Sequence, residues 1–110
     1  MKLKSRLSAV PLNTLACVLV LSGCSTTPKD ETAGWSPNRI YSEATEERAA
    51  GNFEKSVTLL EKLEGRAAGT ALAQQAQIDK AFAQYKTGDK VQAVATLDRF
   101  IRLHPTSPAV

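Results

Sequence analysis

The stretch Leu97–Pro108, with the sequence LDRFIRLHPTSP, decides the fold because it holds the end of one helix and the start signal of another. Apolar residues recur there at helical spacing: Leu97, Phe100, Ile101 and Leu103. Pro105 then prevents the helix from continuing, and Ser107 followed by Pro108 is typical of an N-cap and a first helical residue. We therefore expect a joint between stacked helical units, with the later unit beyond Val110 and the apolar side of the first helix facing it.

Helical periodicity extends backwards from this stretch and predicts four helices. We expect them at about residues 37–50, 53–64, 71–87 and 91–103, with a glycine-containing loop at 65–70. The third helix places four apolar residues together: Ile78, Ala81, Phe82 and Tyr85. Because no stretch alternates with period two, the sequence predicts an all-α fold.

The four helices form two pairs that share an internal repeat. The segment Gly51–Ser56 is echoed by Gly88–Ala93, each with a glycine at the turn and a small residue five places later. The apolar pair Leu60 and Leu63 corresponds in the same way to Leu97 and Phe100. The offset is 37 residues, close to the roughly 34 of a tetratricopeptide repeat. We expect two tetratricopeptide-like helix hairpins, and the alternative is a single four-helix bundle whose apparent repeat is chance.

Residues 1–23 have the architecture of a bacterial signal peptide. A basic start is followed by an apolar run at 15–21, which is too short for the roughly 20 apolar residues that span a bilayer. The tetrapeptide Leu21–Cys24 looks like the lipobox of bacterial lipoproteins, in which the cysteine receives a diacylglyceryl group and becomes the new N-terminus. We therefore expect Cys24 to be lipidated. The alternative is that Cys24 is simply a small residue beside an ordinary cleavage site.

Residues 24–36 are polar and are expected to form a flexible, lipidated tether, because they contain few apolar groups that could offset the entropy of ordering. By resemblance to lipoprotein sorting, Ser25 after the cysteine implies passage to the outer membrane. Ser36 is expected to cap the first helix, with Trp35 packed against Ile40 as a hydrophobic staple. The helical domain then covers residues 37–110.

Charge and composition argue against nucleic-acid binding and catalysis. The formal charge is +3, from 14 basic and 11 acidic residues, and three of the basic residues belong to the signal peptide, which leaves 11 of each sign. A nucleic-acid site needs a basic face that this balance does not supply. His104 is the only histidine and Cys24 the only cysteine after processing, so no nucleophile–base pair or metal cluster is expected. We expect a protein that is not an enzyme and needs no cofactor.

The lipobox, the tether and the segment Asp98–Pro108 together resemble the BamD family, the tetratricopeptide lipoproteins of the bacterial β-barrel assembly machinery. The segments Ile40-Tyr41, Gly51–Phe53 and Tyr85-Lys86 fit the same family at compatible distances. The resemblance covers essentially the whole chain, but the family is about twice as long, with about five repeats. This chain would supply the N-terminal two.

The resemblance implies a non-enzymatic scaffold on the periplasmic face of the outer membrane. Its implied partners are BamA, other Bam lipoproteins and unfolded outer-membrane proteins, whose segments the N-terminal repeats engage. The alternative is another outer-membrane lipoprotein of the same architecture that serves as a protein-binding scaffold in envelope or pilus biogenesis. Lys80 and Gln84 stand where the family commonly has apolar residues, so we expect weaker packing between the two hairpins.

Candidate partner-binding residues follow from the geometry of such repeats, in which the first helix of each pair lines the concave face. They are Asn38, Tyr41, Thr45, Arg48, Phe82 and Tyr85. For the three aromatic residues the alternative is a place in the core, where large aromatic side chains are common.

Overall fold

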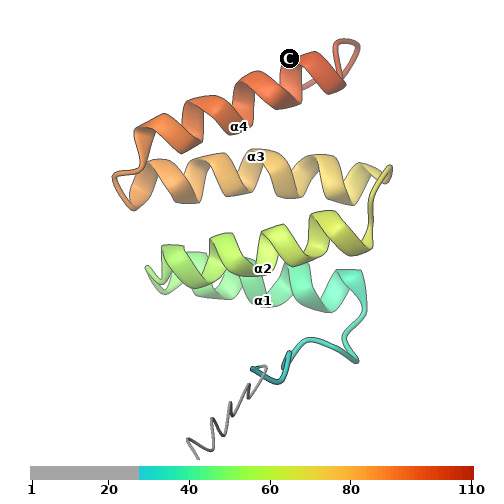
Figure 1. Cartoon of the computed structure of the whole chain (residues 1–110), viewed down its shortest axis with the longest axis vertical. Coiled ribbons are helices and arrows are strands. Elements are labelled where there is room, and N and C mark those ends of the chain that lie inside the picture. The colour runs from blue at the N-terminus through green and yellow to red at the C-terminus, as the bar shows by residue number, and fades with distance from the viewer. Residues whose placement is uncertain (1–27) are drawn as a thin grey trace, which may run out of the picture.

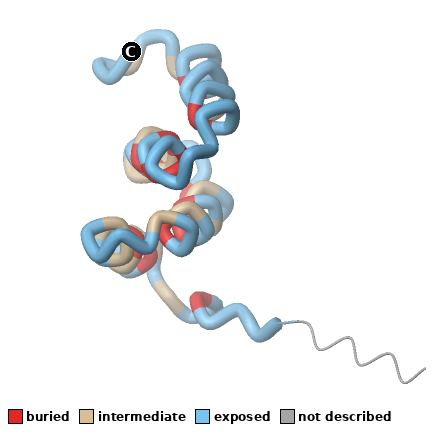
Figure 2. The backbone as a smooth tube through the Cα atoms, turned by 90° about the vertical axis from the view of Figure 1, so that its left-hand side faces the viewer, coloured by how far each residue is buried: buried red, intermediate tan, exposed pale blue. Residues whose placement is uncertain are grey.

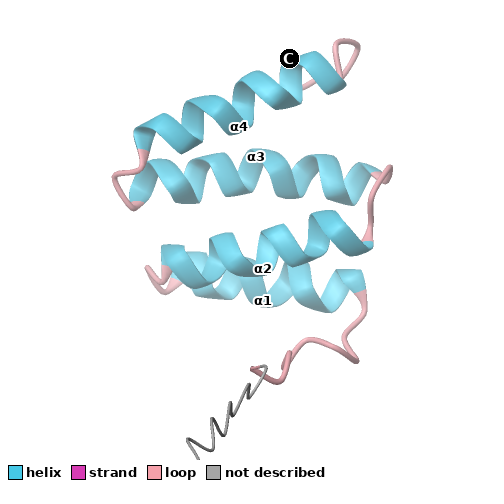
Figure 3. Ribbon diagram, in the orientation of Figure 1, coloured by secondary structure: helices cyan, strands magenta, loops and turns pink. Residues whose placement is uncertain are grey.

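Four helices form most of the structure, a computed structural model that describes residues 28–110 (Figure 1). They are α1 (Pro37–Ala49), α2 (Phe53–Arg66), α3 (Ala71–Lys86) and α4 (Lys90–Leu103). No strand occurs in this part of the chain (Figure 3). Each helix packs against the next one along the chain, and α4 lies at the opposite end of the stack from α1. The all-α prediction of two hairpins is therefore confirmed, and a closed four-helix bundle is excluded.

Side-chain caps explain where three of the helices begin. The side chains of Ser36, Thr70 and Asp89 accept hydrogen bonds from the backbone amides three residues later, at 3.3, 3.2 and 3.2 Å. Such bonds satisfy amide groups that have no partner within the helix. Pro37 occupies the first position of α1, where its missing N–H costs nothing. The predicted start of the first helix is confirmed.

The turn inside each hairpin depends on a glycine in the left-handed conformation. Gly51 has φ = +86° and Gly88 has φ = +88°, a region that side chains other than glycine rarely adopt. The amide of Gly51 donates to the carbonyl of Arg48, and that of Gly88 donates to the carbonyl of Tyr85, both at 3.1 Å. The two turns are thus the same structure repeated 37 residues later.

We expect Gly51→Ala to lower the free energy of unfolding by about 1 kcal/mol, because alanine is strained at positive φ. Gly65→Ala is the matched control, since Gly65 lies inside α2 without positive φ and with open space around it. This control should stabilise the helix by up to about 1 kcal/mol. Urea denaturation followed by circular dichroism measures both changes, and a loss of stability in Gly65→Ala equal to that in Gly51→Ala would contradict the assignment.

The hydrophobic core lies mainly between α1, α2 and the first half of α3 (Figure 2). Its buried members are Ile40, Ala44, Leu59, Leu60, Leu63, Ala67, Ala73 and Ala76, with Trp35, Tyr41 and Leu72 packed against them. Trp35 therefore contacts the cluster that contains its predicted staple partner, Ile40. By contrast, α4 buries only Ala93 and Phe100, so the second hairpin has much less core than the first.

Small residues allow the helices of the first hairpin to approach closely, as the repeat predicts. Ser56 is fully buried, and its hydroxyl donates a hydrogen bond to the carbonyl of Ala44 on the neighbouring helix, at 2.8 Å. This bond satisfies the one polar group that serine brings into the core. In the second hairpin the corresponding pair is Ala81 and Ala93, both buried.

Two predicted boundaries need correction. Helix α2 continues through Gly65 and ends at Arg66, so the loop is shorter than the predicted 65–70. Residues 31–34 form a turn, and Thr32 is buried, so the prediction of a flexible tether does not hold for residues 30–35, which pack against α2. The physical reason is a set of contacts with Arg66, which lies more than 30 residues away along the chain.

The remaining predictions concern the two ends of the sequence. The predicted signal peptide and Cys24 lie outside the described residues. At the other end, α4 stops at Leu103 before Pro105, as expected, and the hydroxyl of Ser107 accepts a hydrogen bond from the amide of Ala109 (3.3 Å). No helix within residues 28–110 has the length and apolar character needed to cross a bilayer.

Candidate functional site

Helices α1 and α3 meet at a buried carboxylate, Asp79. The Tyr41 hydroxyl donates to Asp79 Oδ2 at 2.7 Å, and the Arg48 guanidinium lies 2.9 Å from Oδ1. The Gln75 amide, one turn earlier on α3, donates to the same Oδ1 at 3.2 Å. Asp79 therefore has three donors, two of which come from the other hairpin, so this carboxylate ties the two hairpins together.

The phenol of Tyr41 is held in its neutral form by this arrangement. Burial disfavours the charged phenolate, and the hydrogen bond to the Asp79 carboxylate disfavours it further, so the pKa of Tyr41 is raised above its usual value of 10.0. Tyr41 thus serves as a hydrogen-bond donor across the physiological pH range. Its position against the core makes it a structural contact between the hairpins.

Beside Asp79 lies a group of aromatic and basic side chains, which we call the aromatic–cationic cluster: Arg48, Phe53, Phe82 and Lys86. The rings of Phe53 and Phe82 meet edge to face, with centroids 6.5 Å apart. The Lys86 ammonium lies 5.9 and 5.8 Å from these two rings, and the Arg48 guanidinium lies 5.9 Å from Phe82. Phe82 is still 48% exposed, so the cluster presents an aromatic ring flanked by positive charge.

An apolar groove continues from this cluster along the junction of α3 and α4. It is lined by Ile78, Ala81, Phe82, Tyr85, Lys90, Ala93, Val94 and Leu97. Tyr85 is 57% exposed and Leu97 41% exposed. The predicted gathering of apolar residues on the third helix is therefore present, with Ala81 buried and the two aromatic residues exposed.

The internal repeat explains why this groove is open. Shifting its residues back by 37 positions gives Tyr41, Ala44, Thr45, Arg48, Phe53, Ser56, Val57 and Leu60. In the first hairpin, α3 packs over these positions: its residues join the hydrophobic core, and its Asp79 binds Tyr41 and Arg48. In the second hairpin, no helix within residues 28–110 does so. Ile78 and Tyr85 also replace the polar pair Tyr41 and Arg48, so the second groove is more apolar than its counterpart.

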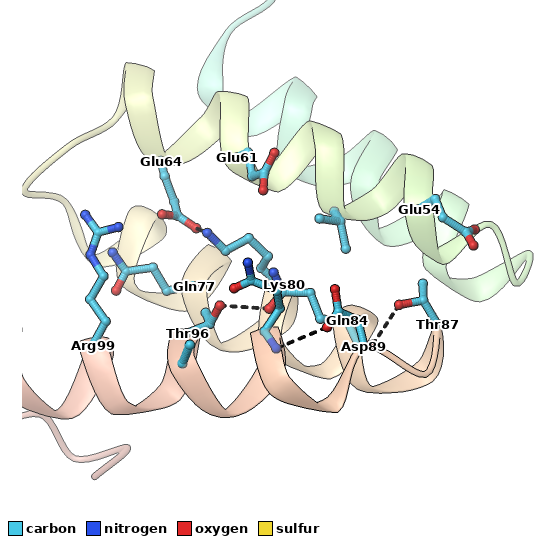
Figure 4. Close-up of a pocket in the computed structure, with 13 residues that line it drawn as sticks. Glu54, Glu61, Glu64, Gln77, Lys80, Gln84, Thr87, Asp89, Thr96 and Arg99 are labelled. Carbon is cyan, nitrogen blue, oxygen red and sulfur yellow. Dashed lines mark hydrogen bonds and ion pairs between the residues drawn. The ribbon is translucent and has the colours of Figure 1, made fainter.

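A second, polar groove lies between α2 and α4, with α3 as its floor (Figure 4). The Lys80 ammonium pairs with the Glu64 carboxylate at 2.7 Å, and both side chains are largely shielded from solvent. The Thr96 hydroxyl donates to the Gln84 side-chain oxygen at 2.8 Å. Lys80 and Gln84 thus bind partners on the neighbouring helices. Of these two bonds only the Lys80–Glu64 pair joins the hairpins, because Gln84 and Thr96 both belong to the second one. The weaker packing expected between the hairpins stays a prediction.

Comparison with known proteins adds to this geometry. The sequence profile of the family described as YfiO, outer membrane lipoprotein, matches residues 34–110, which include all four helices. The chain belongs to the YfiO family. Several curated relatives, each named outer membrane protein assembly factor BamD, agree with this assignment.

The BamD of Neisseria meningitidis serogroup B is 42% identical over 102 residues, which is 88% of this chain and 38% of that protein. The BamD of Vibrio cholerae is 36% identical over 95 residues, covering 86% of this chain and 39% of its own length. The BamD of Haemophilus influenzae is 30% identical over 94 residues, 86% of this chain and 36% of that protein. This member of the YfiO family thus spans less than two fifths of the length of these relatives.

The structure brings together some of the six candidate residues and separates others. Tyr41 and Arg48 converge on Asp79, and Arg48 reaches Phe82 as well. The Thr45 hydroxyl donates to the carbonyl of Tyr41 at 2.9 Å, so its hydrogen bond is made within α1. Asn38 is exposed in the first turn of α1, where it lies on the surface.

Two of the three aromatic candidates are exposed and one is not, and their role in binding a partner stays a prediction. Phe82 and Tyr85 lie at the surface, whereas Tyr41 is half-buried. Sequence reasoning missed Asp79, Phe53 and Lys86, the residues that link the candidates to one another. Within residues 28–110 no group of three histidine, cysteine or acidic side chains gathers to hold a metal ion.

Proposed function

We propose that this chain acts in the assembly of β-barrel proteins into the outer membrane, as a non-enzymatic scaffold anchored by a lipid. The observation that carries the proposal is the family match over residues 34–110, together with relatives that are all named outer membrane protein assembly factors. The proposed partners are BamA, other lipoproteins of the same machinery and unfolded outer-membrane proteins. The proposed location is the periplasmic face of the outer membrane, with Cys24 carrying the acyl chains.

The surface chemistry of the α3 side supports a role in holding unfolded chain segments. Phe82 and Tyr85 offer exposed aromatic surface, and the basic group of Lys86 lies beside Phe82. An extended segment with aromatic and acidic side chains is complementary to this surface, because aromatic rings pack on one another and a carboxylate pairs with the flanking cation. Tyr41 and Arg48 both bind Asp79 and are therefore left out of the proposed contact surface.

We expect a photo-crosslinking amino acid at Tyr85 to capture unfolded outer-membrane protein precursors in cells. The same amino acid at Glu61, which faces the polar groove on the other side of α3, is the matched control. Immunoblotting for a precursor measures the yield at each position. Equal crosslinking yields at the two positions would contradict the proposal that precursors bind this surface.

The role in barrel assembly has its own test, because another envelope scaffold of the same fold would also bind unfolded segments. The full chain should co-purify with the BamA barrel from detergent-solubilised envelopes. Recovery of a different envelope complex without BamA would contradict the proposed function and favour the alternative role in envelope or pilus biogenesis.

A further inference from the structure

One arginine fastens the segment before α1 to the end of α2. We call this segment, residues 30–35, the strap. The Arg66 guanidinium donates to the carbonyl and the hydroxyl oxygen of Thr32 and to the carbonyl of Trp35, and it lies 3.0 Å from Asp30 Oδ2. A planar guanidinium presents several donors in a fixed geometry, so one side chain fixes three residues of the strap at once.

Asp30, at the start of the strap, makes further contacts with α2 and with Thr32. Its Oδ1 pairs with the Lys62 ammonium at 2.6 Å and accepts hydrogen bonds from the amide and hydroxyl of Thr32, at 3.0 and 2.7 Å. These donors hold the pKa of Asp30 well below its usual value of 3.8, with Lys62 as the largest cause. The carboxylate therefore stays charged at neutral and mildly acidic pH. Thr32 is only 3% exposed, so the strap is part of the folded surface.

The strap is not needed to begin α1, because Ser36 already caps that helix. Ordering six more residues costs on the order of 1–2 kcal/mol each in backbone entropy, and several charged contacts offset that cost. Their structural result is to fix the point at which the chain leaves the helices. This point lies beside the first hairpin, at the opposite end of the stack from α4 (Figure 1).

We propose that the strap holds the helical hairpins close to a phospholipid bilayer, by shortening the free link to the anchor at Cys24. This inference rests on the proposed lipidation. Asp30 follows Cys24 by six residues, which span at most about 20 Å when extended. Release of Asp30 and Thr32, with Trp35 still packed against the core, would lengthen the link to eleven residues after Cys24, or at most about 40 Å. The strap thus roughly halves the maximum reach of the anchor.

The same geometry orients the protein relative to the bilayer. Because the strap lies against the first hairpin, a short link favours orientations in which that hairpin lies nearer the membrane than α4 does. The groove between α3 and α4 then stays open to chains that arrive from the aqueous side. A freely jointed link would allow the groove to approach the bilayer.

The experiment uses the full lipidated chain in vesicles of phosphatidylethanolamine and phosphatidylglycerol. Ser42→Cys, an exposed position on α1, carries a donor dye, and rhodamine-labelled lipid is the acceptor. Arg66→Ala and Asp30→Asn are each expected to lower the energy transfer, because a longer link lets the donor lie farther from the lipid and transfer efficiency falls steeply with distance. Arg102→Ala removes an arginine of α4 that has one exposed ion pair, and it should leave the transfer unchanged.

The outcomes separate the strap from the anchor. Vesicle flotation reports the anchor, with Cys24→Ser as the variant that should stay in solution. Both strap variants should float and keep their helical circular dichroism. If their energy transfer is nevertheless unchanged, the proposed role of the strap is wrong and the lipid anchor is unaffected. Failure of the unmodified chain to float would overturn the anchor and the strap together. Asp30→Asn leaves every helical residue intact, so it decides the question if Arg66→Ala unfolds.

Discussion

Replacing Asp79 with alanine is expected to lower the free energy of unfolding by about 3 kcal/mol, because it leaves a partly buried arginine and a phenol without their acceptor. Arg48 and Tyr41 both point at this carboxylate from the other hairpin, at 2.9 and 2.7 Å. Water can reach only part of the space that the carboxylate vacates, since the side chains there are mostly shielded. Urea denaturation of the full chain, followed by circular dichroism at 222 nm, measures the loss.

The chain offers a matched control in Asp98→Ala. Asp98 also pairs with an arginine, Arg102, at 2.8 Å, but both side chains are more than half exposed and lie four residues apart on one helix. Such surface pairs contribute about 0.5 kcal/mol or less. Asp79→Asn separates charge from hydrogen bonding, because the amide oxygen still accepts from Tyr41, and its loss should be smaller than that of alanine. Equal losses in the Asp79→Ala and Asp98→Ala variants would show that Asp79 does not join the hairpins.

The helices and their turns could be predicted because the signals that define them are local. Gly51 and Gly88 end the first helix of each hairpin, and Ser36 with Pro37 begins α1, all within a few residues of the boundary that they fix. Apolar spacing along each helix is likewise visible in a short window of sequence. These features depend on the chain's own backbone geometry, and the structure reproduces them.

The role of Asp79 could not be predicted because its partners are distant in sequence. Tyr41 is 38 residues away, and nothing in the neighbourhood of Asp79 marks it as an acceptor for another helix. An acidic residue on a helix is usually solvated. The repeat geometry accordingly predicts Tyr41 and Arg48 on a partner surface, and the structure shows that Asp79 already binds both.

The strap was missed for the same reason. Residues 25–36 are polar, and composition alone favours a flexible link. What orders residues 30–35 is Arg66, the last residue of α2, together with Lys62 one turn earlier. A distant arginine with several donors thus orders the polar part of the segment, while Trp35 at its end packs against the core.

The two hairpins also differ in burial at positions that the repeat makes equivalent, and this difference leads to the second prediction. Leu60 and Leu97 are 37 residues apart and occupy the same place in their hairpins. Leu60 is 1% exposed, whereas Leu97 is 41% exposed. Leu60→Ala should therefore lower the free energy of unfolding by about 2–5 kcal/mol, the range for a buried leucine whose removal leaves a cavity.

Leu97→Ala is the internal control, because it removes the same atoms from the same place in the repeat. Its loss should be about 1 kcal/mol or less, since a half-exposed side chain loses little contact with its neighbours and leaves no closed cavity. Urea titrations of the two variants give the comparison directly. Nearly equal losses would mean that something covers the groove between α3 and α4 in solution, and a larger loss for Leu97 would place the main core in the second hairpin. The predicted inequality follows from one structural fact: α3 covers the first hairpin, and no helix in residues 28–110 covers the second.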